Sequence, residues 1–466
     1  MNATRKIVIV GHGAAGLTAA LAASEEARAT GNAVDLTVVE RSVEGEHGGN
    51  TRFTPCYMRL EAPGRLSPGF VDDMIAVSSG QNDRAYFEKL AEEAPATMMW
   101  MQTHGIEFHN PVYYLSVGPP RIQPIGAGES IIRELTRAAK EAGVRFRYGC
   151  LAETLERGGS GRMTGLRITD TDGRSETIAA DVVILACGGF QGDPTMLREH
   201  LGAGGETLRM ISPGNRLNAG HGIRMALAVG ARPAGDWRGM HIEPIDPRSR
   251  GPAPVVLVYP YGIVVDTAAN RFFDEGAGLV HETWEEFARS IHFDCRDSEV
   301  YAILDSRLLE IENYGRAIRS EVAPFKADTL EELARMIGIP AVSLESTVGV
   351  YNSACTGDPA KFDATDKDGL AAAAWLIPPK SNWARAIERP PFLAYPLIGA
   401  IAYTFGGIAT DTCARVLGES GPITGLFAAG EITGHFHGTA PNAVAVLRAA
   451  VYGRIAGREA ARASTP

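Results

Sequence analysis

The chain has 466 residues, of which 45% are hydrophobic and 21% charged, the balance of a soluble folded protein. This length is too great for one compact core, so two or three packed units are expected. The 45 basic and 55 acidic side chains leave a net charge of −10. This charge argues against nucleic acid and anionic membranes as partners, because both bind positive surfaces.

The location of the protein is predicted from its apolar runs and its cysteines. No apolar run approaches the roughly 18–20 residues that span a bilayer, and the N-terminal residues lack a signal-peptide pattern. The six cysteines are scattered without a CxxC pair, which favours reduced thiols over disulfides, zinc ligands or iron–sulfur ligands. We therefore expect a cytoplasmic protein with no membrane span and no metal site.

The first motif joins a strand to a helix. Residues 6–10 predict a buried parallel strand, which enters GHGAAG at 11–16 and then a strong helix-forming stretch. Gly11 permits a tight turn, Gly13 lets a pyrophosphate approach the backbone, and Gly16 lets helix and strand pack closely. The free amides at the helix N-terminus then face the anion. This pattern is typical of a dinucleotide site.

Later segments distinguish between the possible dinucleotides. A second strand, 34–39, ends on Glu40, which would accept hydrogen bonds from a ribose and so favours a cofactor without a 2′-phosphate. Two further strand–glycine units, at 181–190 and 425–431, precede a long helical stretch over 444–463. Three such units at both ends of the chain favour the extended FAD molecule over NAD.

The combination and order of the motifs resemble the fumarate reductase/succinate dehydrogenase flavoprotein superfamily, and within it the tricarballylate dehydrogenase-like branch. The resemblance covers essentially the whole chain. It is carried by GHGAAG (11–16), VVER (38–41), GGNTRFT (48–54), DVVILACGGF (181–190), NRFFDEG (270–276), YTFGG (403–407), GLFAAGEITG (425–434) and YGRIAG (452–457).

The resemblance implies an α/β, two-dinucleotide-binding-fold flavoprotein with an inserted α+β capping domain. The Rossmann-like FAD-binding domain would be discontinuous, comprising 1–233 and 388–466, and the cap would comprise 234–387. Pro- and Gly-rich stretches near both borders agree with this division. Family members place the substrate between the cap and the flavin ring, where closure excludes water.

The resemblance also implies which residues hold FAD. They would contact the cofactor from its adenosine end to its flavin end. The set is Gly11, Gly13, Ala15 and Gly16 at the pyrophosphate, Glu40 at the adenosine ribose, Ala152 at adenine, Gly49, Asn50 and Thr51 at the middle of the cofactor, Gly430 and Glu431 at the ribityl chain, Ala445 and Val446 at the flavin pyrimidine, and Arg41, Gly188 and Gly189 as further cofactor-binding residues. Members with covalent flavin carry a histidine where this chain has Asn50, so non-covalent FAD is expected.

The same resemblance suggests catalytic candidates. The segment 237–244 matches a family motif whose histidine binds a substrate carboxylate, a role that falls to His241. Tyr403 replaces a second family histidine, while Thr404 and the following glycines remain. The proton-shuttling arginine expected soon after NRFFDEG and the carboxylate-clamping arginine near 435–443 are both absent, which disfavours fumarate reduction. Arg448 and Arg52 are the candidates for a replacement positive charge.

We therefore predict an FAD-dependent oxidoreductase acting on CH–CH groups, which forms or reduces a carbon–carbon double bond beside a carboxylate or ketone. A tricarballylate-like polycarboxylate is the first candidate substrate. A desaturase of cyclic ketones similar to 3-ketosteroid dehydrogenases is the alternative, with Tyr403, Tyr259 and Tyr261 as acid/base candidates. A second alternative is a non-catalytic subunit that carries a flavin. Because no haem or iron–sulfur spacing occurs, the electron acceptor would be a separate partner protein, a quinone or oxygen; the tricarballylate-like resemblance favours a membrane-associated partner.

Overall fold

The computed structural model describes residues 4–113, 115, 118–295 and 297–463. The chain forms two compact units: unit 1 comprises Met1–Pro111, Pro119–His241 and Ala402–Pro466, and unit 2 comprises Val112–Gly118 and Ile242–Ile401. The predicted domain borders follow the Pro- and Gly-rich stretches. The units instead divide inside two continuous strands, β14 (Met240–Ile245) and β18 (Phe392–Thr404).

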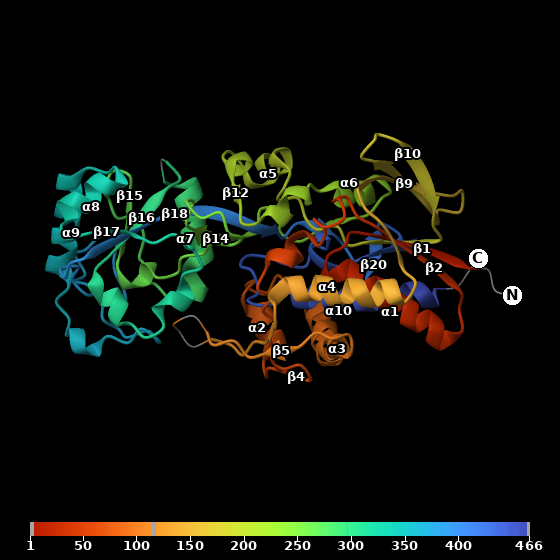
Figure 1. Cartoon of the computed structure of the whole chain (residues 1–466), viewed down its shortest axis with the longest axis horizontal. Coiled ribbons are helices and arrows are strands. Elements are labelled where there is room, and N and C mark those ends of the chain that lie inside the picture. Colours follow the sequence, from red (N-terminus) through yellow and green to blue (C-terminus); the bar gives the residue numbers. More distant parts are fainter. Residues whose placement is uncertain (1–3, 114, 116–117, 296, 464–466) are drawn as a thin grey trace. The chain divides into compact units, whose positions relative to one another are not determined.

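Unit 1 contains the predicted dinucleotide-binding elements (Figure 1). Its strands are β1 (Arg5–Val10), β2 (Val34–Val39), β3 (Leu60–Ala62), β4 (Arg65–Leu66), β5 (Phe108–His109), β6 (Gln123–Pro124), β7 (Arg145–Arg147), β8 (Cys150–Arg157), β9 (Met163–Asp170), β10 (Ser175–Ala179), β11 (Val182–Leu185), β12 (Arg209–Met210), β13 (Pro233–Ala234), β19 (Gly407–Ile408), β20 (Arg415–Gly418) and β21 (Gly421–Ala428). Its helices are α1 (Ala14–Thr30), α2 (Phe70–Ala76), α3 (Arg84–Thr103), α4 (Ala127–Glu141), α5 (Pro194–Leu201), α6 (His221–Ala228) and α10 (Ala445–Arg462).

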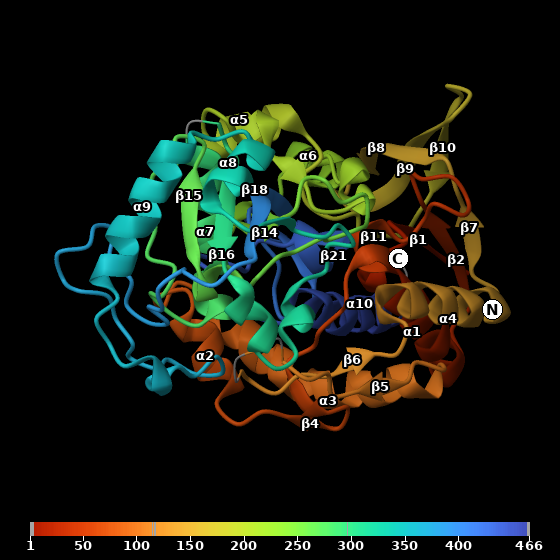
Figure 2. The same ribbon diagram turned by 60° about the vertical axis from the view of Figure 1, so that its left-hand side comes forward.

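The main sheet of unit 1 has the order β20-β21-β11-β1-β2-β7. All neighbours pair in parallel except β20 and β21, which pair in antiparallel fashion. Figure 2 shows β21, β11, β1 and β2 side by side in this order. The β-branched runs form the buried parallel strands that the sequence predicts, because side chains pack on both faces. A separate antiparallel sheet contains β10, β9 and β8.

Helices α1 and α10 pack directly against each other (Figures 1 and 2). A Cβ atom on Gly453 would lie 2.3 Å from the Ala15 carbonyl oxygen, and one on Gly457 would lie 2.2 Å from that of Ala19. Only glycine fits at these distances. Because the contacts advance in the same direction along both helices, the two helices run parallel and begin at the same end of the sheet.

Unit 2 combines an antiparallel sheet with helices. It contains β15 (Ile263–Asp266), β16 (Val300–Leu304), β17 (Phe325–Ala327), α7 (Val280–Phe293), α8 (Leu330–Ile337) and α9 (Ala341–Ala354). In the sheet, β15 pairs with β16, and β18 pairs with β16, β17 and β14. Helices α8 and α9 contribute Leu333, Leu344 and Tyr351 to its core. In the described part of the chain, no helix is long and apolar enough to cross a membrane.

A buried ionic cluster holds unit 2 together. Arg271 donates to both carboxylate oxygens of Glu275, at 3.2 and 2.7 Å, and also to the Pro378 carbonyl at 2.7 Å. The Lys380 ammonium lies 3.7 Å from Glu275 and donates to the Pro260 and Gly262 carbonyls. Burial lowers the pKa of Lys380 to about 8, although the Glu275 charge opposes this. Arg271 thus has a structural role in unit 2.

Replacing Glu275 by Gln tests this cluster. The change keeps the shape of the side chain but leaves two buried cations without their counter-charge, so we expect stability to fall by about 3–5 kcal/mol. Urea unfolding measures the loss. The control is Glu310→Gln, which removes an exposed partner of Arg389 at 3.2 Å and should cost less than about 1 kcal/mol. Equal losses in the two variants would contradict a structural role for the cluster.

Candidate functional site

The three glycine motifs meet at one edge of the unit 1 sheet. The neighbouring parallel strands β1, β11 and β21 end at Val10, Leu185 and Ala428, and each is followed directly by its glycine turn. In open α/β sheets, ligands bind outside the carboxyl ends of the strands. This edge is therefore the candidate cofactor site.

The glycines of the first motif have two different surroundings. A Cβ atom on Gly16 would lie 1.9 Å from the Gly11 carbonyl oxygen, and one on Gly11 would lie 2.4 Å from that of Ala186. These two glycines allow the strands and α1 to pack. A Cβ atom on Gly13, in contrast, meets no atom closer than Thr51 Oγ1 at 3.4 Å. The surface of Gly13 is open, as the approach of a ligand requires.

Two helix N-termini at this edge lack side-chain caps. Gly13 caps α1 and Val444 caps α10, neither with a side-chain hydrogen bond, and neither helix has an acidic residue in its first turn. The Ala14 amide donates to Thr51 Oγ1 at 3.2 Å. The other first-turn amides of α1 have no partner within a helix, and together with the positive end of the helix dipole they suit a pyrophosphate.

Glu40 is oriented by hydrogen bonds at the end of β2. Its carboxylate accepts from the His12 amide at 2.8 Å and from the amide and hydroxyl of Ser42, also at 2.8 Å. The Cys150 amide donates to the Glu40 carbonyl at 2.9 Å, which brings the start of β8 next to this turn. Ala152 lies buried two residues further along β8, and Arg41 donates to the Leu217 carbonyl at 3.4 Å.

Asn50, which is predicted to lie near the middle of FAD, shares one hydrogen-bond acceptor with a second asparagine. Asn50 Nδ2 and Asn215 Nδ2 donate to the Ala402 carbonyl oxygen at 2.9 and 3.0 Å, and Ser212 Oγ donates to Asn50 Oδ1 at 2.9 Å. Gly49 beside them has a positive φ of 52° and nothing within 4 Å of a Cβ position. The Asn50 amide is thus held on both sides by the protein. Sequence reasoning missed Ser212 and Asn215, which lie in a turn without a motif.

Glu431 lies where the motifs at 181–190, 403–407 and 425–434 meet. It accepts from the Thr404 amide at 3.1 Å and from Gln191 Nε2 at 3.3 Å. Burial raises the pKa of Glu431 to about 7, and these hydrogen bonds and the charge of Arg448 oppose the increase. Thr404 Oγ1 accepts from the Phe190 amide at 3.2 Å. A Cβ atom on Gly189 would lie 2.3 Å from both Glu431 and Thr404, so this position requires glycine; Gly188 beside it has a φ of 76°.

His241 and Tyr403 lie together, as their proposed shared role requires. They are on β14 and β18, which pair in the sheet, and their ring centroids are 4.9 Å apart at an interplanar angle of 31°. The Tyr403 ring also lies 5.9 Å from Phe405 and 6.3 Å from Phe436. Strand pairing therefore unites two residues that are 162 positions apart in the sequence.

The two arginine candidates have different surroundings. Arg52 Nε donates to Glu129 at 2.6 Å, and Nη1 of the same side chain donates to the Gly45 carbonyl. Arg448 is only 1% exposed, and its guanidinium carbon lies 3.7 Å from the centroid of the Phe436 ring. Arg52 is thus engaged in an ion pair, and Arg448 is enclosed by protein.

Several other side chains that could ionise have structural roles. His435 is buried, lies 2.8 Å from Thr410 Oγ1 and stacks on Tyr86 at 3.7 Å. Burial lowers its pKa to about 3, so it stays neutral. Tyr259 is fully buried against Thr283, and Tyr261 donates to the Ala364 carbonyl at 2.7 Å. Among the described residues, no cluster of His, Cys, Asp and Glu could hold a metal ion.

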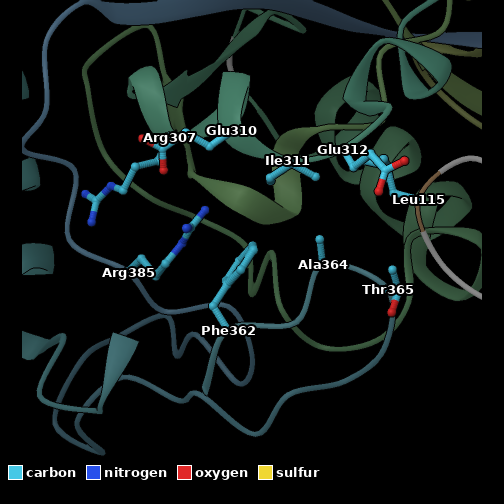
Figure 3. Close-up of a pocket in the computed structure, with 9 residues that line it drawn as sticks. All are labelled: Leu115, Arg307, Glu310, Ile311, Glu312, Phe362, Ala364, Thr365 and Arg385. Atoms are coloured by element: carbon cyan, nitrogen blue, oxygen red, sulfur yellow. The ribbon is translucent and has the colours of Figure 1, made fainter. Parts of the chain in front are cut away.

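Unit 2 contains a pocket of about 320 Å³ that the sequence did not indicate. Figure 3 shows Arg385 and Phe362 side by side in it, and the guanidinium carbon lies 3.4 Å from the centroid of the ring. Arg307, which also lines the pocket, is paired with the buried Asp305. None of the nine lining residues belongs to the predicted FAD or catalytic sets.

Comparison with known proteins identifies the family. The model of a family described as "FAD binding domain" matches residues 6–445. The chain belongs to this family. The open Gly13, the uncapped helix N-termini and the oriented Glu40 fit FAD as its cofactor. The chain is therefore an FAD-dependent oxidoreductase, with the α/β flavoprotein fold that the sequence predicts.

Individual relatives agree with this assignment. The chain is 27% identical to "Probable fumarate reductase Ifc3" of Shewanella frigidimarina, over 98% of this chain and 75% of that protein. It is 31% identical to "4-oxocyclohexanecarboxylate 2-dehydrogenase" of Sinomonas cyclohexanicum, over 66% of this chain and 56% of that protein, so it spans little more than half of that relative's length.

Solved structures share the fold. The open conformation of a flavocytochrome c3 fumarate reductase matches with a TM-score of 0.77 at 24% identity, over 99% of this chain and 78% of that one. A 3-ketosteroid delta1-dehydrogenase from Sterolibacterium denitrificans, solved with 1,4-androstadiene-3,17-dione, matches with a TM-score of 0.75 at 20% identity, over 99% and 100% of the two chains.

The contrast between Gly13 and Gly16 gives a test of the cofactor site. Gly13→Ala adds a methyl group that makes only an ordinary van der Waals contact with Thr51 Oγ1, so we expect normal thermal unfolding of the FAD-free chain but at least about tenfold weaker FAD binding, or about 1.4 kcal/mol. Gly16→Ala is the matched control, because its methyl group would overlap the Gly11 carbonyl and lower stability itself. Fluorescence titration with FAD measures the affinity. Unchanged affinity in Gly13→Ala would place the pyrophosphate elsewhere.

Proposed function

We propose that this chain forms or reduces a carbon–carbon double bond next to a carboxylate or ketone of a small molecule. The observation that carries the proposal is the His241–Tyr403 pair, two groups that can donate hydrogen bonds, with centroids 4.9 Å apart. Such chemistry requires donors that hold the activating oxygen and a group that exchanges a proton at the neighbouring carbon. The relatives named for fumarate and 4-oxocyclohexanecarboxylate support this reaction class.

The side chains divide these tasks by chemistry. The bound flavin would supply the two-electron oxidation or reduction. His241 would donate to a substrate oxygen, and the Tyr403 hydroxyl would donate to the same group or exchange the proton. Thr404 lies buried between Glu431 and Phe190, so it would act by fixing the end of β18. Because Tyr403 precedes Thr404 on β18, fixing Thr404 would also fix Tyr403.

A tricarballylate-like polycarboxylate remains the first candidate substrate, in line with the resemblance to that branch. A cyclic ketone is the second, and two observations favour it. Tyr403 replaces a histidine of the fumarate reductases, and the relative at 31% identity is named for a cyclic ketone that also carries a carboxylate. Arg52, an expected carboxylate clamp, is paired with Glu129 in this structure.

The remaining assignments follow from the same site. FAD would be bound non-covalently, since Asn50 stands at the attachment position and its amide is held by Ala402 and Ser212. Electrons would pass to or from a separate carrier: a partner protein, a quinone or oxygen. The six free cysteines support a cytoplasmic location.

The Tyr403→Phe variant tests the proposal. An anaerobic screen of di- and tricarboxylates and cyclic ketones, followed by flavin absorbance, first identifies the compound that bleaches or restores the flavin colour. With it, we expect Tyr403→Phe to lower kcat by about 10²–10⁴-fold while FAD stays bound. Tyr395→Phe, on the same strand and buried, is the control and should retain near-normal kcat. Equal rates for wild type and Tyr403→Phe would exclude this role, and no bleaching by any compound would favour a non-catalytic flavin subunit.

A further inference from the structure

Arg448 is a buried positive charge without a matching negative one. Its Nη1 atom donates to the Thr433 carbonyl at 3.2 Å, whereas Nε and Nη2 are buried and have no hydrogen-bond partner. In the described part of the chain, no carboxylate lies within ion-pair distance of it. A buried charge without a counter-charge is costly.

The neighbouring titratable groups do not cancel this charge. Burial raises the pKa of Glu431 to about 7, so near neutral pH its carboxyl is only partly ionised. Burial and the charge of Arg448 keep the imidazole of His435 neutral. Burial also raises the pKa of Tyr86, which stays a phenol although the guanidinium charge opposes the increase. The surroundings of Arg448 therefore have a positive potential.

The sheet order indicates which part of the cofactor this potential reaches. Glu40 ends β2, on one side of β1, and an adenosine ribose belongs there. The strands on the other side of β1 are β11 and β21, so the flavin half would pass along their ends and along Gly430. A Cβ atom on Gly430 would lie 3.2 Å from Ala15 at the start of α1 and 3.5 Å from Ala449 on α10.

The parallel packing of α1 and α10 shows how far the start of α10 extends beyond the start of α1. Gly453 lies level with Ala15. Helix α1 begins one residue before Ala15, whereas α10 begins eight residues before Gly453. At 1.5 Å per residue, the first turn of α10 therefore extends about 10 Å past the start of α1, beyond the pyrophosphate. Arg448 lies in that first turn.

We propose that the positive charge of Arg448 stabilises the reduced flavin and so raises the reduction potential of the flavin. The bound flavin would supply two-electron chemistry, and its reduction with one proton would leave one negative charge on the ring. The Arg448 guanidinium and the α10 amides stabilise that charge through the protein, without contact between Arg448 and the substrate. This role rests on the proposed function only for the placement of the flavin half.

The experiment compares the flavin midpoint potential of the FAD-loaded wild type with that of the Arg448→Met, Arg448→Gln and Arg448→Lys variants, with no substrate present. We expect the two neutral variants to shift the equilibrium at least tenfold toward oxidised flavin, a potential about 30 mV lower for a two-electron couple. Arg448→Lys keeps the charge and should stay within about threefold of the wild type.

The control is Arg5→Met. Arg5 is another buried arginine of unit 1, 6% exposed, but it lies at the start of β1, at the opposite edge of the sheet from Gly11. Its removal should leave the potential unchanged. Sulfite gives a second readout, because its addition to oxidised flavin also leaves negative charge on the ring; its affinity should fall at least tenfold in the neutral variants.

The possible results distinguish a failure of the Arg448 role from a failure of the proposed function. An unchanged potential and sulfite affinity in both neutral variants would overturn the role of Arg448 and leave the proposed function intact. An equal fall in Arg5→Met would show a general loss of structure and would also overturn it. Failure of the wild type to bind FAD would overturn the proposed function itself. If Arg448→Met does not fold, Arg448→Gln decides the result, because its amide can keep the hydrogen bond to Thr433.

Discussion

The close contact between α1 and α10 is the constraint on which the site depends. Gly453 and Gly457 let α10 approach the backbone of α1 at Ala15 and Ala19, where a methyl group would overlap a carbonyl oxygen. Two helices from opposite ends of the chain are thereby fixed in parallel, with both N-termini at the carboxyl edge of the sheet. A ligand as long as FAD can then meet a positive helix end at two points along its length.

The same edge is stabilised by polar contacts that cross between motifs. Thr404 and Gln191 both donate to Glu431, and Phe190 donates to Thr404, so the ends of β11, β18 and β21 are tied together around one carboxyl group. This group is buried enough for its pKa to reach about 7. This network fixes the backbone at Thr404. It therefore also fixes the position of Tyr403, the preceding residue of β18.

The strands, the helices and the glycine turns of the cofactor motifs were predictable from sequence because each is encoded locally. The runs at 6–10 and 34–39, for example, form β1 and β2, and the long helical stretch at 444–463 forms α10. The contacts of Ser212 and Asn215 with Asn50 and Ala402 were not predictable, because they join segments far apart in sequence and no motif marks them.

Burial was the other property that sequence could not supply. Arg52 and Arg448 are both candidates for binding a carboxylate from sequence, but Arg52 is engaged by Glu129, and Arg448 is enclosed beside Phe436. His435 is a neutral member of an aromatic stack. Each outcome depends on tertiary neighbours, which residue type and spacing do not specify.

The roles of these arginines bear on the choice of substrate. A polycarboxylate brings two or three charges, and each needs a cation or several donors when it leaves water. His241 and Tyr403 offer hydrogen-bond donors suited to one oxygen-bearing group, while the Arg448 side chain is enclosed by protein. A polycarboxylate would therefore need further cations or donors for its remaining carboxylates, whereas a ketone or a single carboxylate would not.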